Sequence, residues 1–360
     1  MKRGYLFVAI GLVVVAVLAV VVANATDPAD LGGGTEIRST RDLPVIEKGP
    51  RPSLALGNGW TNSKPLTKAD LEGKVVVYDF WTYSCVNCVR TLPYLESWHE
   101  RYAKDGLVIV GVHSPEFDFE KIHNNVTAAV KRLKITYPVV FDDEMAVWSA
   151  FHNQYWPAKY IADGNGDLRY VHFGEGEYGQ TEDAIRVLLG VATGSPRAAD
   201  PKLKESSPGL VNTPETYLGS ERGSTSSPQK LEDGEHRFTV PDEIPRNSFA
   251  LEGDWLVSSQ SIESTDAHET LHLRYHAGEV NLVFDRTRKN PTYAVIELDG
   301  KPVPKRAWGS SIVERDGQTV VDIDAADLYH LVANGPEGEH TLTVHPGGSG
   351  VQLFAFTFGS

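Results

Sequence analysis

Cysteine is scarce in this sequence: its 360 residues contain only two, Cys85 and Cys88, both within the stretch DFWTYSCVNCVRTLP. A framework of several disulfides is therefore excluded. A single bridge across so short a loop is a weak staple, since the chain-entropy estimate gives it only about 2 kcal/mol. A zinc site is disfavoured as well, because no second cysteine pair exists and the histidines of this region lack the H-x3-H spacing. We therefore interpret the two cysteines as a redox pair.

Clusters of Lys and Arg are also missing, and the formal net charge is −14, so a nucleic-acid partner is not expected. Charge is absent altogether between Gly4 and Thr26, which follow Lys2 and Arg3. An apolar run of about 20 residues can span a bilayer. The sequence predicts a transmembrane signal-anchor at 1–25, with the remainder of the chain extracytoplasmic and in an oxidising compartment.

The alternative is a cleavable signal peptide, because Ala23-Asn24-Ala25 matches the pattern of small residues at a cleavage site. Either form would export the rest of the chain. After it, residues 26–50 have the Gly- and Pro-containing composition of a flexible spacer.

Residues 51–193 alternate between strand and helix patterns. KVVVYDF, LVIVGVHS and YPVVFDD are short apolar runs suited to buried strands, whereas CVRTLPYLESWHERYAKDG, FEKIHNNVTAAVKRLKI, MAVWSAFHNQY and TEDAIRVLLGVA have helical spacing. AKYIADGNGDLRYVHFGEG is two alternating runs around a turn and predicts a hairpin. The expected domain is α/β, with a mixed sheet covered by helices on both faces.

The pattern changes beyond a linker at 194–212. Residues 213–360 contain short strand-like runs with turn signals between them and almost no helical period, as in LVSSQSIES, TYAVIELDG and VQLFAFTFG. Regular spacing of this kind predicts an all-β sandwich of jelly-roll type. Its aromatic residues Trp255, Tyr275, Tyr293 and Trp308 are candidates for a sugar-binding face, although aromatic residues in a sandwich more often belong to the core.

The cysteine pair follows a predicted strand and opens a predicted helix. A helix N-terminus stabilises a thiolate, so Cys85 is expected to attack, and Cys88, one turn further in, to resolve the mixed disulfide. Asp79 lies in the preceding apolar run, where a buried carboxyl would have a raised pKa and could exchange a proton with Cys88. Pro157, after Trp156, starts the strand of the hairpin, and the residues alone leave its cis or trans state open.

At these motifs the chain resembles the TlpA and DipZ families of thioredoxin-like proteins. The similarity rests on VVVYDFWTYSCVNCVRTLPYL, NQYWPAKYIAD and GEGEYGQTEDAIRVLL, and the β-rich part is similar to the carbohydrate-binding-module-like domain of DipZ proteins. The resemblance implies a thioredoxin-like fold in which Cys85 is the nucleophile, Cys88 the resolving thiol and Asp79 the buried proton acceptor. It also implies that Pro157 is a cis-proline beside the disulfide and that Trp156 and Pro157 bind substrate.

The chain departs from these families at three places near the cysteines. Ser84 precedes the first cysteine where a Trp is common, Val86-Asn87 replaces a Pro-containing dipeptide, and Thr91 stands where many relatives carry a functional Glu. The reduction potential and the acid–base role of that Glu therefore cannot be carried over from relatives.

Taken together, these features predict a membrane-anchored, extracytoplasmic thiol-disulfide oxidoreductase that reduces disulfides of exported proteins and needs no metal or cofactor besides its cysteines. By the resemblance it would take electrons from a membrane donor of the CcdA/DsbD type and act in cytochrome c biogenesis. One alternative is a thiol peroxidase of the AhpC/TSA kind, because Thr82 lies three residues before Cys85. The other is a cell-wall or glycan-binding protein whose redox domain is accessory.

Overall fold

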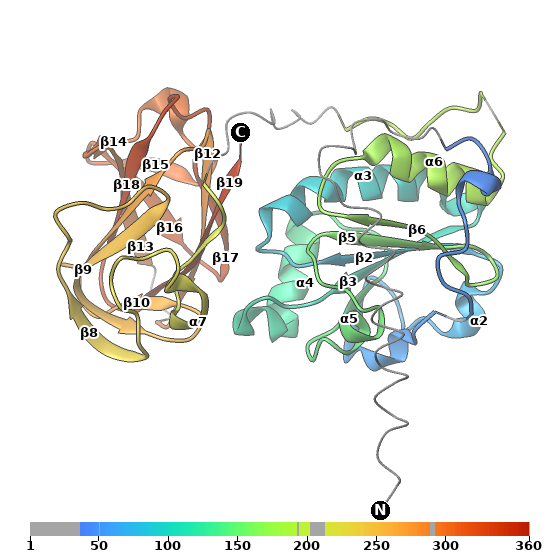
Figure 1. Ribbon diagram of the computed structural model, residues 1–360, viewed down its shortest axis with the longest axis horizontal. Helices are drawn as coiled ribbons and strands as arrows, with labels where there is room; N and C mark the ends of the chain where they lie inside the picture. The colour runs from blue at the N-terminus through green and yellow to red at the C-terminus, as the bar shows by residue number, and fades with distance from the viewer. Residues whose placement is uncertain (1–36, 50, 193, 202–212, 289–291, 360) are drawn as a thin grey trace, which may run out of the picture.

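A computed structural model describes most of the chain, namely residues 37–49, 51–192, 194–201, 213–288 and 292–359. The transmembrane segment predicted at 1–25 and residues 26–36 and 50 of the spacer lie outside the described residues. Within the described part, no helix is both long and apolar enough to cross a bilayer. The chain forms two halves that lie side by side, an α/β half and an all-β half (Figure 1).

The N-terminal half is built on a six-stranded mixed sheet in the order β1-β4-β3-β2-β5-β6. Its strands are β1 (Gly59–Thr61), β2 (Val75–Trp81), β3 (Leu107–His113), β4 (Val139–Phe141), β5 (Ala158–Ala162) and β6 (Leu168–Phe173). β2 is central, parallel to β3 and antiparallel to β5. Every residue of β2 is buried, which is the environment its continuous apolar sequence requires.

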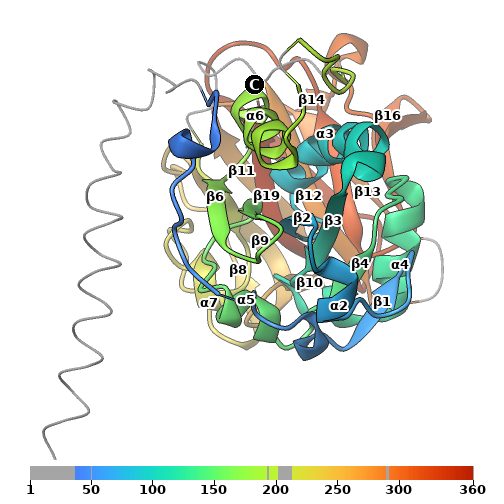
Figure 2. The ribbon, with the colours of Figure 1, turned by 90° about the vertical axis from the view of Figure 1, so that its right-hand side faces the viewer.

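Helices cover both faces of this sheet. They are α2 (Lys68–Leu71), α3 (Val86–Tyr102), α4 (His123–Arg132), α5 (Ala146–Ala150) and α6 (Tyr178–Leu189), with the 3-10 turns η1 (Thr40–Asp42), η2 (Leu54–Leu56), η3 (Ala103–Asp105) and η4 (Asp118–Lys121). Because side chains of a strand alternate between faces, Val77 and Trp81 of β2 join the core formed with α3, α4 and α6, whereas Tyr78 and Phe80 join the core containing α5. Figure 2, with this half toward the viewer, shows α3 and α6 together along one side.

The predicted alternation of strands and helices and the hairpin of β5 and β6 are confirmed. One predicted helix, FEKIHNNVTAAVKRLKI, is instead broken at Ile122, whose backbone is extended between η4 and α4. The break follows from local hydrogen bonds: the Glu120 side chain accepts the backbone N–H groups of Glu116 and Phe117, and the Asn125 side chain donates to the Phe119 carbonyl. These side chains hold the 3-10 turn and prevent a continuous helix.

The C-terminal half is all β apart from two short helical turns, α7 (Ser220–Gly223) and η5 (Lys305–Ala307). Its strands are β7 (Thr216–Tyr217), β8 (Gly234–Phe238), β9 (Ser248–Val257), β10 (Ile262–Ser264), β11 (Thr270–Tyr275), β12 (Glu279–Arg286), β13 (Thr292–Leu298), β14 (Lys301–Pro302), β15 (Ile312–Arg315), β16 (Gln318–Ile323), β17 (Asp327–Val332), β18 (His340–Pro346) and β19 (Val351–Gly359). The main path of pairing is β15-β16-β13-β18-β11-β9-β10-β19-β12-β17, so the expected all-β architecture is confirmed.

β9 belongs to both parts of this sheet. Its first half, Ser248 to Glu252, pairs with β11, and its second half, Gly253 to Val257, pairs with β8, while β10 pairs with its last three residues. Gly253 at the corner has a φ of +93°, and a Cβ there would lie 3.2 Å from the Cα of Glu269. A glycine is therefore needed where the strand turns from one part to the other, and apolar side chains from both parts fill one core.

The two halves are docked through polar and aromatic contacts. The Phe354 ring of β19 packs edge-on against Phe117 and Phe119, with ring centroids 5.2 Å and 4.8 Å apart. Arg90 of α3 forms an ion pair with Glu279 of β12 at 2.6 Å. In Figure 1 the strands β12, β17 and β19 form the side of the β half that faces the α/β half. The segment from the loop after β3 into η4, the start of α3 and the end of α4, where Arg132 pairs with Asp327 of β17, are thus parts of the N-terminal half that meet its neighbour.

Candidate redox site

The two cysteines lie at the start of α3, at the end of the central strand β2. Cys85 is the N-cap of the helix and its sulfur accepts the backbone N–H of Cys88 at 3.3 Å. Both are free thiols, and the Cys88 Sγ donates to Cys85 Sγ at 2.7 Å. Cys85 is partly exposed, whereas Cys88 is fully buried. Burial, followed by the neighbouring Cys85 sulfur, raises the pKa of the Cys88 thiol. The geometry therefore gives the pair one accessible sulfur and one sheltered, protonated sulfur.

Asp79 sits beneath this helix in the middle of β2. It has the same strand parity as Val77 and Trp81, so it faces α3 rather than α5. Its neighbour across β5 is Lys159, and both side chains are fully buried. The Lys159 Nζ lies 3.8 Å from Asp79 Oδ1, and neither side chain has a hydrogen bond to any described residue. Burial raises the pKa of Asp79 to about 6, against the opposing charge of Lys159.

A second buried carboxyl, Glu120 of η4, holds the loop that leads into the cysteines. Its Oε1 accepts the hydroxyls of Thr82 and Ser84, the latter at 2.6 Å. Its Oε2 accepts the N–H groups of Glu116 and Phe117, at 2.6 Å and 3.0 Å. Burial raises the pKa of Glu120 to about 7, while the two hydroxyl donors oppose that rise. This carboxyl therefore joins the cysteine loop to the segment that contacts the C-terminal half.

His113, at the end of β3, completes this buried group. Its Nε2 is 3.3 Å from the Thr82 hydroxyl, and its ring stacks on Tyr83 at 5.6 Å. Because the Thr82 proton is donated to Glu120, the hydroxyl oxygen accepts from His113 Nε2, which fixes the tautomer. Burial lowers the pKa of His113 to about 3, so the ring is neutral.

Trp156 and Pro157 lie on the other side of the cysteines. The Trp156–Pro157 peptide bond is cis, as the resemblance implies. The indole Nε1 of Trp156 donates to the Ser114 carbonyl at 3.0 Å, and its ring packs against Trp148 at 4.1 Å. Trp156 lines a cavity with Cys85, whereas Pro157 is buried behind it, where its carbonyl accepts the N–H of Gly174 at 2.7 Å.

That cavity has a volume of about 410 Å³ and opens in front of Cys85 between the two halves of the molecule. From the N-terminal half, Tyr155 and Trp156 line it, and from the C-terminal half Tyr217 and Phe358 do so. The reactive sulfur is thus reached through a space whose walls come from both halves.

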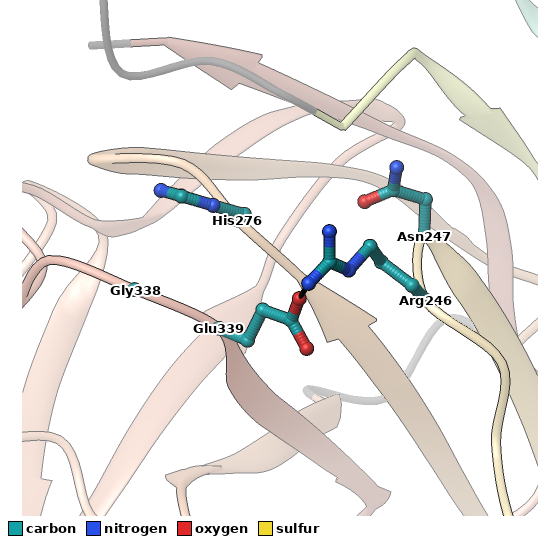
Figure 3. A pocket seen from close by; sticks show the side chains of 5 residues that line it. All are labelled: Arg246, Asn247, His276, Gly338 and Glu339. Carbon is teal, nitrogen blue, oxygen red and sulfur yellow. Dashed lines mark ion pairs between the residues drawn. The ribbon is translucent and has the colours of Figure 1, made fainter.

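A second, larger cavity of about 690 Å³ lies within the C-terminal half (Figure 3). Its lining consists of Arg246, Asn247, His276, Gly338 and Glu339, with Arg246 paired to Glu339. None of these is a Trp, Tyr or Phe of the kind that stacks on a sugar ring. Of the four aromatic residues considered for a sugar-binding face, Trp255 and Tyr275 are fully buried core residues, so only Tyr293 and Trp308 keep any exposed ring.

Among the described residues, no group of three or more His, Cys, Asp or Glu side chains is arranged to hold a metal ion. Thr91 donates its hydroxyl to the Cys88 carbonyl at 2.9 Å. The fully buried acidic groups near the cysteines are Asp79 and Glu120, and Glu116 and Glu215 line the cavity in front of Cys85.

Lys159 and Glu120 were not predicted from the sequence. Lys159 could have been noticed as a charged residue inside the apolar strand AKYIA, at the register that faces Asp79. Glu120 carries no such signal, because FEKI has the composition of an ordinary exposed turn. Tyr217 and Phe358 line the cavity only because the two halves dock against each other. The hydrophobic periodicity of the sequence does not predict that docking.

Two families match the chain, one on each half. The AhpC/TSA family matches residues 50–171, and the family described as thioredoxin like C-terminal domain matches residues 213–359. The chain is 35% identical over 319 residues to the protein DipZ of Mycobacterium tuberculosis, which covers 86% of this chain and 43% of that protein. The chain thus spans less than half the length of the DipZ proteins that it matches. It is also 32% identical over 141 residues to the thiol-disulfide oxidoreductase YkuV of Bacillus subtilis, covering 39% of this chain and 94% of YkuV.

Proposed function

This chain belongs to the thioredoxin-like thiol-disulfide oxidoreductases, and from that premise we propose that it reduces disulfides of exported proteins through Cys85 and Cys88. The observation that carries the proposal is the arrangement of the two sulfurs, with Cys85 exposed to a cavity and Cys88 buried 2.7 Å behind it. A pair with one accessible and one sheltered thiol is suited to a two-step exchange.

In the first step the Cys85 thiolate attacks a client disulfide. A Cys85–client disulfide forms, and the other client sulfur leaves as a thiolate. The N–H of Cys88, which points at the Cys85 sulfur, stabilises the negative charge of the attacking thiolate. In the second step the Cys88 thiol loses its proton and attacks Cys85, which closes the Cys85–Cys88 disulfide and releases the second client thiol.

The second step needs a proton acceptor, because the pKa of Cys88 is raised by burial. Asp79 is proposed to accept that proton. It lies under α3, its pKa is raised to about 6 by burial, and its negative charge is among the causes that raise the Cys88 pKa. Neither carboxyl oxygen has a hydrogen-bond partner among the described residues, so taking up a proton breaks no existing bond.

Trp156 is proposed to contact the client directly and Pro157, buried behind it, to shape the main chain of the same client-binding surface. The cysteine pair is proposed to be the only redox group. Each turnover leaves that pair oxidised, so two electrons and two protons must come from a dithiol donor. We propose a membrane donor of the CcdA/DsbD type for this role, with a place in cytochrome c biogenesis. The remaining parts of the proposal are a signal-anchor at 1–25, an extracytoplasmic location, a jelly-roll-like C-terminal sandwich and a glycan as its further partner.

Thiol peroxidase activity is the second candidate, because the AhpC/TSA family matches residues 50–171 and Thr82 lies three residues before Cys85. In that reaction Cys85 would become a sulfenic acid and Cys88 would condense with it, releasing water. The Thr82 hydroxyl, however, is already donated to Glu120 rather than pointing to a peroxide at Cys85. This contact favours disulfide exchange.

The two activities are separated by one pair of assays on the full chain. With dithiothreitol as electron donor, we expect insulin disulfides to be reduced and hydrogen peroxide to be consumed no faster than by dithiothreitol alone. Cys88→Ser should accumulate mixed disulfides with insulin chains, and Cys85→Ser should form none. Rapid peroxide consumption without insulin reduction would reject the proposal.

A further inference from the structure

The cavity in front of Cys85 has a wall that the redox domain does not supply. On one side are Tyr155, which is 53% exposed, and Trp156, both from the segment before β5. On the other side are Tyr217 of β7 and Phe358 of β19, from the C-terminal half. Glu116, Glu215 and Arg222 line the same cavity. A client disulfide that reaches Cys85 must therefore enter a space with aromatic and charged side chains from both halves.

This second wall is fixed in place by direct contacts. The Tyr217 hydroxyl lies 2.7 Å from both Glu116 Oε1 and Glu215 Oε2, and the Arg222 guanidinium forms an ion pair with the Glu116 carboxylate at 2.8 Å. Arg222 also covers the Tyr217 ring, with its guanidinium carbon 3.5 Å from the ring centroid. Glu116 in turn precedes the turn held by Glu120, so the wall is tied to the segment that supports the cysteine loop.

The size of the cavity restricts what can enter it. A volume of about 410 Å³ lies near the lower end of the range for ligand pockets, which is roughly 300–1,000 Å³. It has room for a short stretch of polypeptide in extended form but not for the face of a folded domain. Aromatic side chains on opposite walls can contact the residues on either side of a bound cysteine.

We propose that this cleft is the client-binding site, that its occupant is an extended polypeptide segment carrying the client disulfide, and that Tyr217 and Phe358 are specificity-determining contacts from the C-terminal half. The inference rests on the proposed function, since it requires Cys85 to attack a polypeptide disulfide. It assigns the C-terminal half a direct part in choosing clients: disulfides in loops and chain ends are accepted, and disulfides on flat folded surfaces are not.

Cross-linking from a trapped client tests this assignment. The full-length Cys88→Ser variant is mixed with a short peptide whose single cysteine is linked to thionitrobenzoate and which carries a benzophenone two residues away. Attack by Cys85 forms the peptide–Cys85 disulfide and releases thionitrobenzoate, which is measured by its colour. Illumination should then link the peptide to Tyr217, Phe358 or their neighbours as well as to Trp156.

Cross-links confined to the N-terminal half would overturn the role of the C-terminal wall. Absence of thionitrobenzoate release would instead reject the proposed function on which the inference rests, so the two failures are distinguishable.

Steady-state kinetics provide an independent measurement. Tyr217→Ala should raise KM for an extended peptide disulfide at least fivefold, a much larger increase than for the small hydroxyethyl disulfide, which does not reach the C-terminal wall. Tyr293→Ala, a matched change at a 38% exposed tyrosine outside the cleft, should alter none of these values. Equal KM values for the two variants would contradict the assignment.

Discussion

Two buried carboxyls lie close to the cysteine loop, and they differ in how they are bonded. Glu120 accepts four hydrogen bonds, two from hydroxyls and two from backbone N–H groups. Asp79 accepts none from the described residues and has only the Lys159 ammonium at 3.8 Å. Burial raises the pKa of both, to about 7 and about 6. Both carboxyl groups are fully buried, but Glu120 has four hydrogen-bond donors around it and Asp79 has none among the described residues.

The difference separates a structural role from a chemical one. A carboxyl with four donors is costly to move, because each donor would lose its partner. A carboxyl without hydrogen bonds can take up and release a proton with little rearrangement. We therefore expect Glu120 to hold the loop in place and Asp79 to handle the proton of Cys88.

Removal of the Lys159 charge should have the largest effect. Lys159→Met leaves Asp79 buried without a counter-charge, and breaking a buried pair in this way costs about 3–5 kcal/mol. Urea unfolding at pH 8 should show this loss, with a smaller loss at pH 5, where Asp79 takes a proton. The double variant Asp79→Asn, Lys159→Met should recover most of the stability. An equal loss at both pH values would show that the pair is not ionised.

The second-largest expected effect is a change of stability with pH that is caused by Asp79. Its pKa is raised from the usual 3.8 to about 6, so the folded state binds the proton more tightly than the unfolded state. Its favourable contribution is complete below pH 3.8 and is lost as the pH rises through about 6, by about 3 kcal/mol. Asp79→Asn should lack this decline. Glu120 causes a similar decline in the wild type and in the Asp79→Asn variant. The difference between their free energies of unfolding at each pH therefore reports Asp79 alone.

Glu120→Gln should lower the free energy of unfolding by about 2 kcal/mol, since an amide replaces charge-assisted hydrogen bonds and presents only one acceptor oxygen. The loop that carries the cysteines should also become looser, and we expect faster alkylation of Cys88 by iodoacetamide.

Glu269 provides the matched control for this substitution. It is a buried carboxylate in the C-terminal half that accepts from Thr265 and Asp266. Glu269→Gln should lose comparable stability without changing Cys88 alkylation. Equal alkylation rates in the two variants would remove the link between Glu120 and the loop.

The smallest expected effect is kinetic. Asp79→Asn should slow the second step, closure of the Cys85–Cys88 disulfide, about tenfold, while attack by Cys85 changes by less than about twofold. Single-turnover reactions followed by acid quenching separate the two steps. If both steps keep their wild-type rates, Asp79 has no part in proton transfer.

Much of the fold follows from local sequence patterns. The apolar runs of β2 and β3 and the helical spacing of α3 are strong signals, because each segment alone determines its period and burial. The position of Cys85 at the mouth of α3 and Cys88 inside it follows from the same local reasoning. These are short-range properties of the chain.

The remaining features depend on contacts between distant segments. Asp79 and Lys159 are 80 positions apart and meet only through the register of β2 and β5. Glu120 reaches Thr82 and Ser84 from a turn that sequence patterns assign to a helix. The aromatic wall of the cleft requires the docking of two domains. None of these is encoded in periodicity or composition.

The passage of β9 through both parts of the β-sheet has a consequence for cooperativity. One strand hydrogen-bonds to β11 with its first half and to β8 and β10 with its second, so it joins the two parts into one hydrogen-bonded unit. The C-terminal half should thus behave as a single foldon, in which the amide hydrogens of β9 exchange with solvent only when the whole half unfolds. Phe358 lies in β19, and Tyr217 lies in β7, which pairs with β19. The wall that faces Cys85 should therefore be as rigid as this foldon.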